Sequence, residues 1–448
     1  MGVGGSNPSE RATIPPGDLV RNGTGRLRLW RARATPRGLS PGLRPKSHGS
    51  LRPPVLSLFR QAAFVRLWSV GGLANAMRWL EVLAAGLYTF QLTQSGLVVA
   101  AVIACRMLPM LLLGALVGAV AEALNRRQLL LAGQVLMAGA AGAVALLAVA
   151  GQAQPWHIAL GGLVSGTVWA AEMATRRRMI GEAAGLERVV TAVGLDSVTN
   201  AATRMLGPLL GGVTYEVIGL AGAYAISSAV HFCTAAIVAG LAYRQDVRRL
   251  RLASIPLDIV AGLRMARERP LLLMVFAVTI VTNAFGFSYS GLIAPIGQGR
   301  FGVSPSYVGI LAAAEPLGAI LGGLLLASGR VALNRRLVFI GGTTLFLLSL
   351  VGLALLPAFW LAVGVLVLGG FGTAGFGNMQ STLVMTLAPA EMRSRLFGIV
   401  TVCIGTSPLG VLLAGLMSSF LTPAGAVLAM AATGLLLLTP IAWFLARR

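Results

Sequence analysis

The chain has 448 residues, of which 56% are hydrophobic and only 11% are charged. Roughly a quarter of the residues of a soluble domain are charged, so this chain has too little polar surface to cover a water-facing globule. The composition therefore excludes a soluble protein and predicts an integral membrane protein surrounded by lipid. The formal net charge of +22 does not indicate a nucleic-acid partner, because the basic residues lie mostly in short loops rather than on one folded basic face.

Residues 1–56 form a basic leader that is rich in Arg, Pro, Gly and Ser, and we expect it to be disordered. It lacks the apolar core of a secretory signal peptide. Two interpretations stay open: a flexible basic arm that lies on anionic lipid, or an over-extended reading frame ahead of a membrane protein that begins near Leu56.

Twelve apolar runs follow the leader, each close to the 20 or so residues that a helix needs to cross a bilayer. A polar linker at 243–270 separates an N-terminal half, 57–242, from a C-terminal half, 271–448. The end of the linker mixes apolar residues with arginines and predicts a short amphipathic helix on the membrane surface. The runs are 67–90, 98–121, 129–150, 156–174, 190–213, 220–241, 271–293, 307–327, 337–356, 359–378, 396–420 and 424–445.

The basic residues predict the orientation of these runs. Of the 36 Lys and Arg residues, 32 lie before the first run, in the loops that follow even-numbered runs or in the C-terminal tail. Only Arg300 lies in the opposite loops, and the remaining three lie within runs. Because cytoplasmic loops carry the excess of basic residues, we expect both termini in the cytoplasm.

The pentapeptide ALNRR occurs twice, at 123–127 and at 332–336, in the loops after the second and the eighth run. A glycine pair that permits close helix packing precedes each copy. Two halves of six helices with matched loops resemble the major facilitator superfamily of transporters. The resemblance implies an all-α fold of twelve membrane helices in two similar halves.

The first copy resembles the loop motif of this superfamily, in which an acidic residue at the helix end pairs with basic residues in one conformation and is released in the other. The second copy has no acid at the matching place, so a weaker conformational latch is expected there. The motif residues are Gly118, Glu122, Arg126 and Arg127 in the first half and Asn334, Arg335 and Arg336 in the second.

The fifth run contains GLDSVTNAATRMLGPLLGG, which resembles the motif typical of exporters in this superfamily, with Thr203 in place of one glycine. The resemblance favours efflux over uptake and implies a kinked packing helix. Further stretches from about Leu56 onward resemble the branch of macrolide- and siderophore-exporter-like proteins. The matching motif residues are Gly194, Gly207, Pro208, Gly211 and Gly212.

Charged residues inside the runs are costly in lipid, so we expect them to face a cavity or a partner. One hypothesis is that Glu81 exchanges protons with the cavity beside Arg78 or Arg106, with Glu315 as the second candidate. The alternative is that Arg78 and Glu81, on one helix face, form a buried pair that only fixes packing. Acidic residues are frequent in the first helix of exporters of this superfamily, which supports Glu81, whereas the fourth run lacks an arginine that many antiporters carry.

Other polar residues are expected to have lesser roles. Asp196 and Arg204 are predicted as gate or packing residues, and Glu172 with the arginines at 176–178 as a solvated helix end. An apolar cavity with one or two acids would suit large, amphipathic or cationic compounds. The candidates for its lining are Asn75, Met107, Trp169, Asn283, Phe287 and Tyr289.

An enzyme is not expected, because the chain has three histidines and no metalloprotease, phosphate-loop or nucleophile motif. Its three cysteines fall in apolar runs and indicate neither a metal site nor a disulfide framework, and no cofactor is expected. We predict a monomeric, multi-pass transporter of the cell membrane, which exports a small amphipathic compound, drug-like or siderophore-like, in exchange for protons. A flippase for lipids or lipophiles, or an importer, without strict proton coupling, stays open as the alternative.

Overall fold

A computed structural model describes residues 54–185, 187–243, 264–265, 267–328, 334–389 and 392–446, all within one compact unit, Arg52–Arg448. The side chains of 54–55, 113–123, 174, 394 and 444–446 also lie outside the description. Of the predicted leader, 1–53 lie outside the described residues, and of the predicted linker with its amphipathic helix, 244–263 and 266 do.

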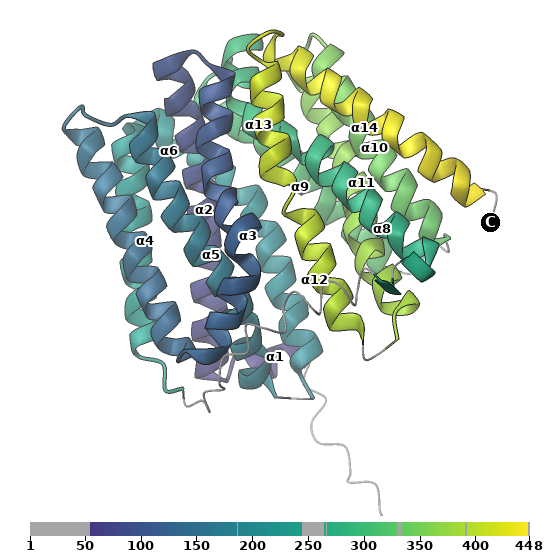
Figure 1. The fold of residues 1–448 in the computed structure, drawn as a ribbon. Helices are drawn as coiled ribbons and strands as arrows, with labels where there is room; N and C mark the ends of the chain where they lie inside the picture. The colour runs from purple at the N-terminus through teal and green to yellow at the C-terminus, as the bar shows by residue number, and fades with distance from the viewer. Residues whose placement is uncertain are drawn as a thin grey trace, which may run out of the picture. The chain divides into compact units, whose positions relative to one another are not determined.

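The described residues form helices and no strand, as the sequence predicts (Figure 1). The helix α1 (Pro54–Leu58) begins in the predicted leader. The segment predicted as the N-terminal half contains α2 (Ala62–Thr93), α3 (Gly96–Ala123), α4 (Arg126–Val149), α5 (Pro155–Ala184) and α6 (Val189–Ala239). The C-terminal half contains α8 (Pro270–Val281), η1 (Thr282–Gly286), η2 (Phe287–Leu292), η3 (Pro295–Arg300), α9 (Pro305–Ala327), α10 (Arg335–Leu355), α11 (Phe359–Leu387), α12 (Arg393–Ile404), α13 (Ser407–Met417) and α14 (Pro423–Ala446).

Nine helical segments within the described part of the chain are long and apolar enough to cross a membrane, and Gly96–Leu112 is a shorter apolar helix. The 51-residue α6 is two helices that join without a loop at Gly219, whose φ of 66° and ψ of −168° are not helical. This break separates the runs predicted at 190–213 and 220–241. The count of twelve spans and the side of the membrane on which the termini lie stay predictions.

Each ALNRR copy begins a helix with its asparagine. Asn125 Oδ1 accepts hydrogen bonds from the backbone N–H groups of Arg127 at 3.1 Å and Gln128 at 3.3 Å at the start of α4. Asn334 Oδ1 accepts from the N–H of Arg336 at 3.0 Å at the start of α10. The first N–H groups of a helix have no partner inside it, so an asparagine cap stabilises this end. The repeat thus marks equivalent helix starts in the two halves.

The two halves meet where small residues let helix backbones approach. A Cβ atom on Gly212 of α6 would lie 2.5 Å from the carbonyl oxygen of Pro305 at the start of α9, and one on Gly309 would lie 2.7 Å from the carbonyl oxygen of Pro208. Gly415 of α13 faces Ala100 of α3 in the same way. Glycine at such crossings permits packing that any side chain would prevent.

The seventh predicted run is not a regular α-helix. It changes from α-helix to π-helix at Thr282–Gly286 and to 3₁₀-helix at Phe287–Leu292. Alongside it, α12 and α13 are separated by Gly405 and Thr406, and Ser407 Oγ donates to the carbonyl oxygen of Asn283 at 3.2 Å. Irregular backbone at membrane depth is tolerated where protein groups satisfy its polar atoms.

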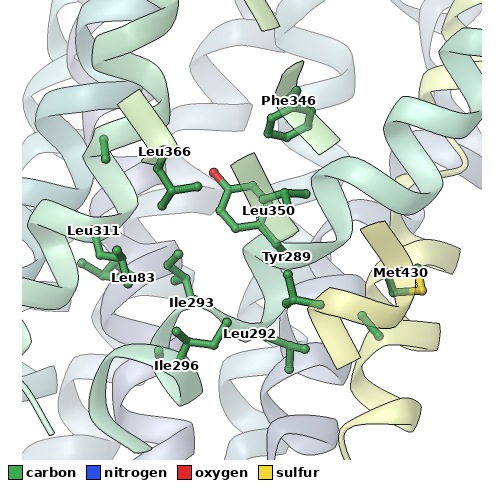
Figure 2. Packing of buried hydrophobic residues seen from close by; sticks show 14 of the residues in the cluster. Leu83, Tyr289, Leu292, Ile293, Ile296, Leu311, Phe346, Leu350, Leu366 and Met430 are labelled. Carbon is green, nitrogen blue, oxygen red and sulfur yellow. The ribbon is translucent and has the colours of Figure 1, made fainter. Parts of the chain in front are cut away.

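One apolar cluster connects the halves in the described part of the chain. It includes Leu83 from the N-terminal half and Leu311 and Phe346 from the C-terminal half. Figure 2 shows Tyr289 among these side chains, with Leu350 and Phe346 nearby. The irregular η2 segment is therefore held by packing on several sides.

Candidate functional site

A cavity of about 300 Å³ lies between the halves, lined by residues from α2, α3, α5, α6, η1, η2, α9 and the α12–α13 junction. Five of the six residues predicted for its lining are there: Met107, Trp169, Asn283, Phe287 and Tyr289. The sixth, Asn75, is not among the lining residues, because its side chain bonds to Thr203 and Arg78 inside the N-terminal half. A bundle of helices positions these side chains from segments far apart in the sequence.

A wider depression of about 760 Å³ lies elsewhere, lined mainly by the α2–α3 loop, η3 and the start of α14. Its one charged lining residue, Arg300, donates to the carbonyl oxygens of Leu353 at 2.6 Å and Leu356 at 3.0 Å. The cavity between the halves, by contrast, is lined by buried charged groups, and it is therefore the candidate site.

Glu81 in α2 is buried and pairs with Arg106 of α3. Arg106 Nη1 donates to Glu81 Oε2 at 3.0 Å, and Ser227 Oγ of α6 donates to Oε1. Arg106 lines the cavity, whereas Glu81 lies behind it, beside a void of about 10 Å³ that Tyr224 also lines. Arg106 thus lines both the cavity and the void beside Glu81.

Arg78 does not pair with Glu81, the partner that the sequence suggests. Its Nη2 lies 3.5 Å from Glu172 Oε2 of α5, its Nη1 donates to Asn75 Oδ1 at 2.7 Å, and its guanidinium lies 4.9 Å from the ring centre of Trp169. The two residues of α2 share a helix face, but their long side chains extend to different neighbouring helices. The pair within α2 that the alternative hypothesis assumed is not formed in the structure, and each residue joins α2 to another helix.

Glu172 and Arg176 do not form a solvated helix end, because each is only 6% exposed. Arg176 Nε lies 3.4 Å from Glu172 Oε1, and its Nη1 pairs with Asp196 of α6. A Cβ atom on Gly71 of α2 would collide with the Arg176 guanidinium, so glycine there makes room for it. The next two arginines, at 177 and 178, are exposed as expected.

Arg204 and Glu315 form an ion pair between the halves. Arg204 Nη2 of α6 bonds to Glu315 Oε2 of α9, and Thr373 Oγ1 of α11 donates to Oε1. Both charged residues line the cavity; the side chain of Glu315 is 3% exposed and that of Arg204 is 29% exposed. Arg204 and Asp196, predicted together as gate or packing residues, thus take part in different ion pairs.

The glycines of the exporter-like motif divide between two neighbours. Cβ atoms on Gly207 and Gly211 would meet the backbone of α2 around Leu80, whereas Gly212 faces α9. A Cβ atom on Gly194 would meet nothing within 4 Å. The motif helix packs as expected, and Pro208 within it also lines the cavity.

The loop motif of the first half is anchored to α5 and α6. Arg126 Nη1 bonds to Glu182 at 2.9 Å and to the Tyr243 hydroxyl at 2.7 Å, and Arg127 donates to the last carbonyl oxygens of α6. Burial, together with the hydrogen bond to Glu182, raises the pKa of Tyr243, so its phenol stays protonated. The side chains of Gly118 and Glu122 lie outside the described residues, as do the first glycine pair and the start of the second ALNRR copy.

In the second half, Arg335 is exposed and Arg336 is half-buried beside an apolar groove between α8 and α11. The glycine pair ahead of this copy packs on α11: Gly318 faces Val367 and Gly370, and a Cβ atom on Gly322 would lie 2.9 Å from Phe371 Cα. Within the residues that the structure describes, no three His, Cys, Asp or Glu side chains lie close enough to hold a metal ion.

Sequence reasoning missed several partners of the buried charges, among them Glu172, Arg176, Ser227 and Thr373. The spacing of Glu172 and Arg176, four residues apart on a helix, is a weak signal of pairing. Ser227 and Thr373 carry no signal in the sequence, because a hydroxyl in an apolar helix more often bonds to its own backbone.

Residues 54–447 match the transmembrane secretion effector family of the major facilitator superfamily. The chain belongs to this family. The match confirms the predicted superfamily and a multi-pass protein of the cell membrane, and the family is one of membrane transporters rather than enzymes.

Two relatives of this secretion effector family protein are exporters by name. The enterobactin exporter EntS of Citrobacter koseri is 26% identical over 245 residues, which are 53% of this chain and 57% of the exporter. The multidrug efflux pump Tap of Mycolicibacterium fortuitum is 24% identical over 321 residues, which are 69% of this chain and 77% of the pump. The chain thus aligns with little more than half the length of the enterobactin exporter.

Solved structures share the fold of this secretion effector family protein. A bacterial homologue of the human lysosomal transporter Spinster, in an inward-facing and unoccupied conformation, has a TM-score of 0.68 at 15% identity, covering 86% of this chain and 96% of its own. The nucleoside transporter NupG has a TM-score of 0.68 at 14% identity, covering 85% and 98%. At these identities the likeness shows the fold alone, which is that of the superfamily.

Proposed function

We propose that this protein is a secondary active exporter that moves a small amphipathic compound out of the cell in exchange for protons. It works as a monomer of twelve membrane helices with both termini in the cytoplasm. The observation that carries the proposal is the ion pair between the partly exposed Arg204 and the buried Glu315, which joins the two halves beside the cavity between them.

The position of this pair supports a role in alternating access. Glu315 lies ten residues after Pro305, which is about 15 Å along α9 at the helical rise. Near Pro305 a second contact joins the halves, because Glu216 accepts hydrogen bonds from Ser304 Oγ at 2.9 Å and from the N–H of Ser306 at 2.8 Å. Both contacts hold α6 against α9, so rocking of the halves has to break them.

Protonation of Glu315 would weaken the closed contact. A neutral carboxyl group no longer attracts the Arg204 guanidinium, and an arginine that loses its partner in a buried site is destabilised. Proton binding would therefore favour separation of α6 from α9 on that side of the cavity. Proton release would favour the paired arrangement, and this difference is what couples a gradient to the movement.

Glu81 is the second proton-exchange residue in the proposal. Its carboxylate is held by Arg106 and Ser227, and Arg106 lines the cavity. A substrate or proton that displaces Arg106 would expose Glu81. The N-terminal half could then respond to substrate or proton binding independently of the Arg204–Glu315 pair. Arg78, paired with Glu172, is assigned to positioning α2 against α5 rather than to proton exchange.

The direction of transport rests on resemblance. The exporter-like motif in α6 and the names of both relatives support efflux. The alternatives, a lipid or lipophile flippase or an importer, use the same cavity without strict proton coupling, and the experiment separates them.

The experiment measures efflux from cells that express the full chain and are preloaded with a panel of dyes, antibiotics and siderophores, with and without a proton uncoupler. We expect reduced accumulation of at least one compound, loss of this effect with the uncoupler, and loss in Glu81→Gln and Glu315→Gln. Glu187→Gln, at an exposed position, is the matched control and should behave as wild type. Unchanged accumulation across the panel would overturn the exporter. Transport that survives both the uncoupler and the two variants would favour the flippase, and increased accumulation of a compound would favour the importer.

A further inference from the structure

More cationic than anionic side chains line the cavity. Its lining includes three arginines, Arg78, Arg106 and Arg204, and one carboxylate, Glu315. The carboxylates of Glu81 and Glu172 pair with two of these arginines but do not line the cavity. Each of these two pairs therefore contributes its arginine, and not its carboxylate, to the lining.

The whole charge cluster is balanced, since Arg176 and Asp196 form a further pair away from the cavity. A ligand in the cavity nevertheless meets the cations first, and electrostatic interactions weaken with distance. The exposed fractions agree: the side chain of Arg204 is 29% exposed, against 3% for its partner Glu315. The surface offered to a ligand is therefore positive.

Two of the arginines at the cavity, Arg78 and Arg106, have N–H groups that lack an acceptor among the described residues. A guanidinium has five N–H groups and no acceptor. Within the described part of the chain, Arg106 Nη2 and Arg78 Nε are themselves buried and have no acceptor, so a shift of either side chain toward the cavity would offer an unused donor to a ligand. Donors of this kind suit an oxyanion, since charge-assisted hydrogen bonds from arginine to carboxylate are among the strongest in proteins.

The rest of the lining is apolar and aromatic. Trp79, Trp169, Phe287 and Tyr289 face the cavity, and Trp169 already lies over Arg78 at 4.9 Å. A volume of about 300 Å³ is at the lower end of the range for small-molecule sites. These walls suit a flat apolar body of one to a few rings.

We infer that the cavity binds amphipathic organic anions, with the anionic group at Arg204 and Arg106 and an aromatic body against the tryptophans and Phe287. This inference rests on the proposed transport function and names its substrate class. It replaces the cationic compounds that the sequence suggested, because Glu81 does not line the cavity and Glu315 is bound to Arg204.

The test compares three ligands with one body and different charges: 1-naphthylacetate, 1-naphthylethanol and 1-naphthylmethyl-trimethylammonium. Equilibrium dialysis measures their binding at pH 7 to the full chain in nanodiscs of phosphatidylcholine, with empty nanodiscs as the blank. We expect the anion to bind at least about tenfold more tightly than the cation, with the neutral alcohol between them.

Two variants test the assignment of the anionic group. Arg204→Gln should weaken anion binding about tenfold and change binding of the alcohol less than about twofold. The double variant Arg204→Gln/Glu315→Gln, which leaves no unpaired carboxylate, should show the same selective loss if the single variant folds poorly. Arg177→Gln, at an exposed position on α5, is the matched control and should bind all three ligands like wild type.

Equal binding of the three ligands, preference for the cation, or no anion binding up to about 1 mM would overturn the inference. So would anion affinity that is unchanged in both Arg204 variants. Binding does not depend on transport, so the two proposals fail separately. Anion-selective binding without efflux would contradict the exporter, and efflux without charge preference would contradict the substrate class.

Discussion

Glu315 of α9 is bound to Arg204 of α6, and the pair joins the two halves of the protein at the wall of the cavity between them. Thr373 of α11 donates a hydrogen bond to the same carboxylate, so three helices meet at one buried charge. The contacts of Gly212, Gly309 and Gly415 between the halves involve small residues, which respond weakly to protons or to ligand charge. The Arg204–Glu315 pair is a contact that both protonation and a charged ligand can change.

Neutralising Glu315 should shift the protein toward the arrangement in which α6 and α9 separate near Glu315. Spin labels on Val190→Cys, near the start of α6, and on Leu324→Cys, near the end of α9, report this movement, because both sites are exposed and distant from the ion pair along their helices. The native Cys105, Cys233 and Cys403 are first replaced by Ala. We expect Glu315→Gln to add a shorter component to the distance distribution. Glu268→Gln, at an exposed site, should leave the distribution unchanged. Identical distributions for the wild type, Glu315→Gln and Glu268→Gln would contradict the role of the Arg204–Glu315 pair in this movement.

Replacing only one member of the Glu81–Arg106 pair should destabilise the protein more than replacing both members. Arg106→Gln leaves a buried carboxylate without its cation, which typically costs about 3–5 kcal/mol. The double variant Glu81→Gln/Arg106→Gln keeps a neutral hydrogen-bonding pair and should recover much of this loss. Thermal unfolding of the purified proteins in one detergent measures the difference, and additive effects of the two substitutions would show that the pair is not coupled.

The glycines of the exporter-like motif should differ in their tolerance of alanine. A Cβ atom on Gly211 would lie 2.8 Å from the carbonyl oxygen of Leu80, so Gly211→Ala has to push α6 from α2 and should lower both thermal stability and transport. Gly194 has nothing within 4 Å of its Cβ position, so Gly194→Ala should be neutral or stabilise the helix by up to about 1 kcal/mol. Equal losses in the two variants would contradict the packing described for this helix.

The asparagine caps of α4 and α10 should contribute similarly to stability. Asn125→Ala and Asn334→Ala each remove a cap, which typically costs about 1 kcal/mol, whereas aspartate at either position can still accept the hydrogen bonds. Thermal unfolding of the alanine and aspartate variants compares them directly. Equal stability of the alanine and aspartate variants would contradict the capping role.

The two loop copies should differ in their effect on transport. From the sequence motif, Glu122→Gln is expected to impair efflux more than Asn334→Ala. Arg126 and Arg127 beside it are tied to α5 and α6, which supports a mechanical role for the first copy. The efflux assay with matched expression levels measures both variants, and equal impairment would mean that the asymmetry of the copies has no functional weight.

Much of the architecture follows from local properties of the sequence. Apolar runs of membrane length predict helices because lipid leaves the backbone no other partner than itself. The positions of asparagine, glycine and proline mark where those helices begin and pack. Five of the six residues predicted for the cavity lining lie at the cavity in the structure, whereas the amide of Asn75 bonds to Arg78 and Thr203 instead.

The sequence by itself determined that this is a helical membrane protein of the major facilitator superfamily with charged groups inside its helices. Only the tertiary structure decided which charges pair: Arg78 with Glu172, Arg106 with Glu81, and Arg204 with Glu315 across the halves. It also decided that Glu172 and Arg176 are buried, because α2 and α6 bring partners to them. Helix formation depends on neighbours along the chain, whereas an arginine side chain reaches whichever helix packing places beside it, and spacing in the sequence does not specify that neighbour.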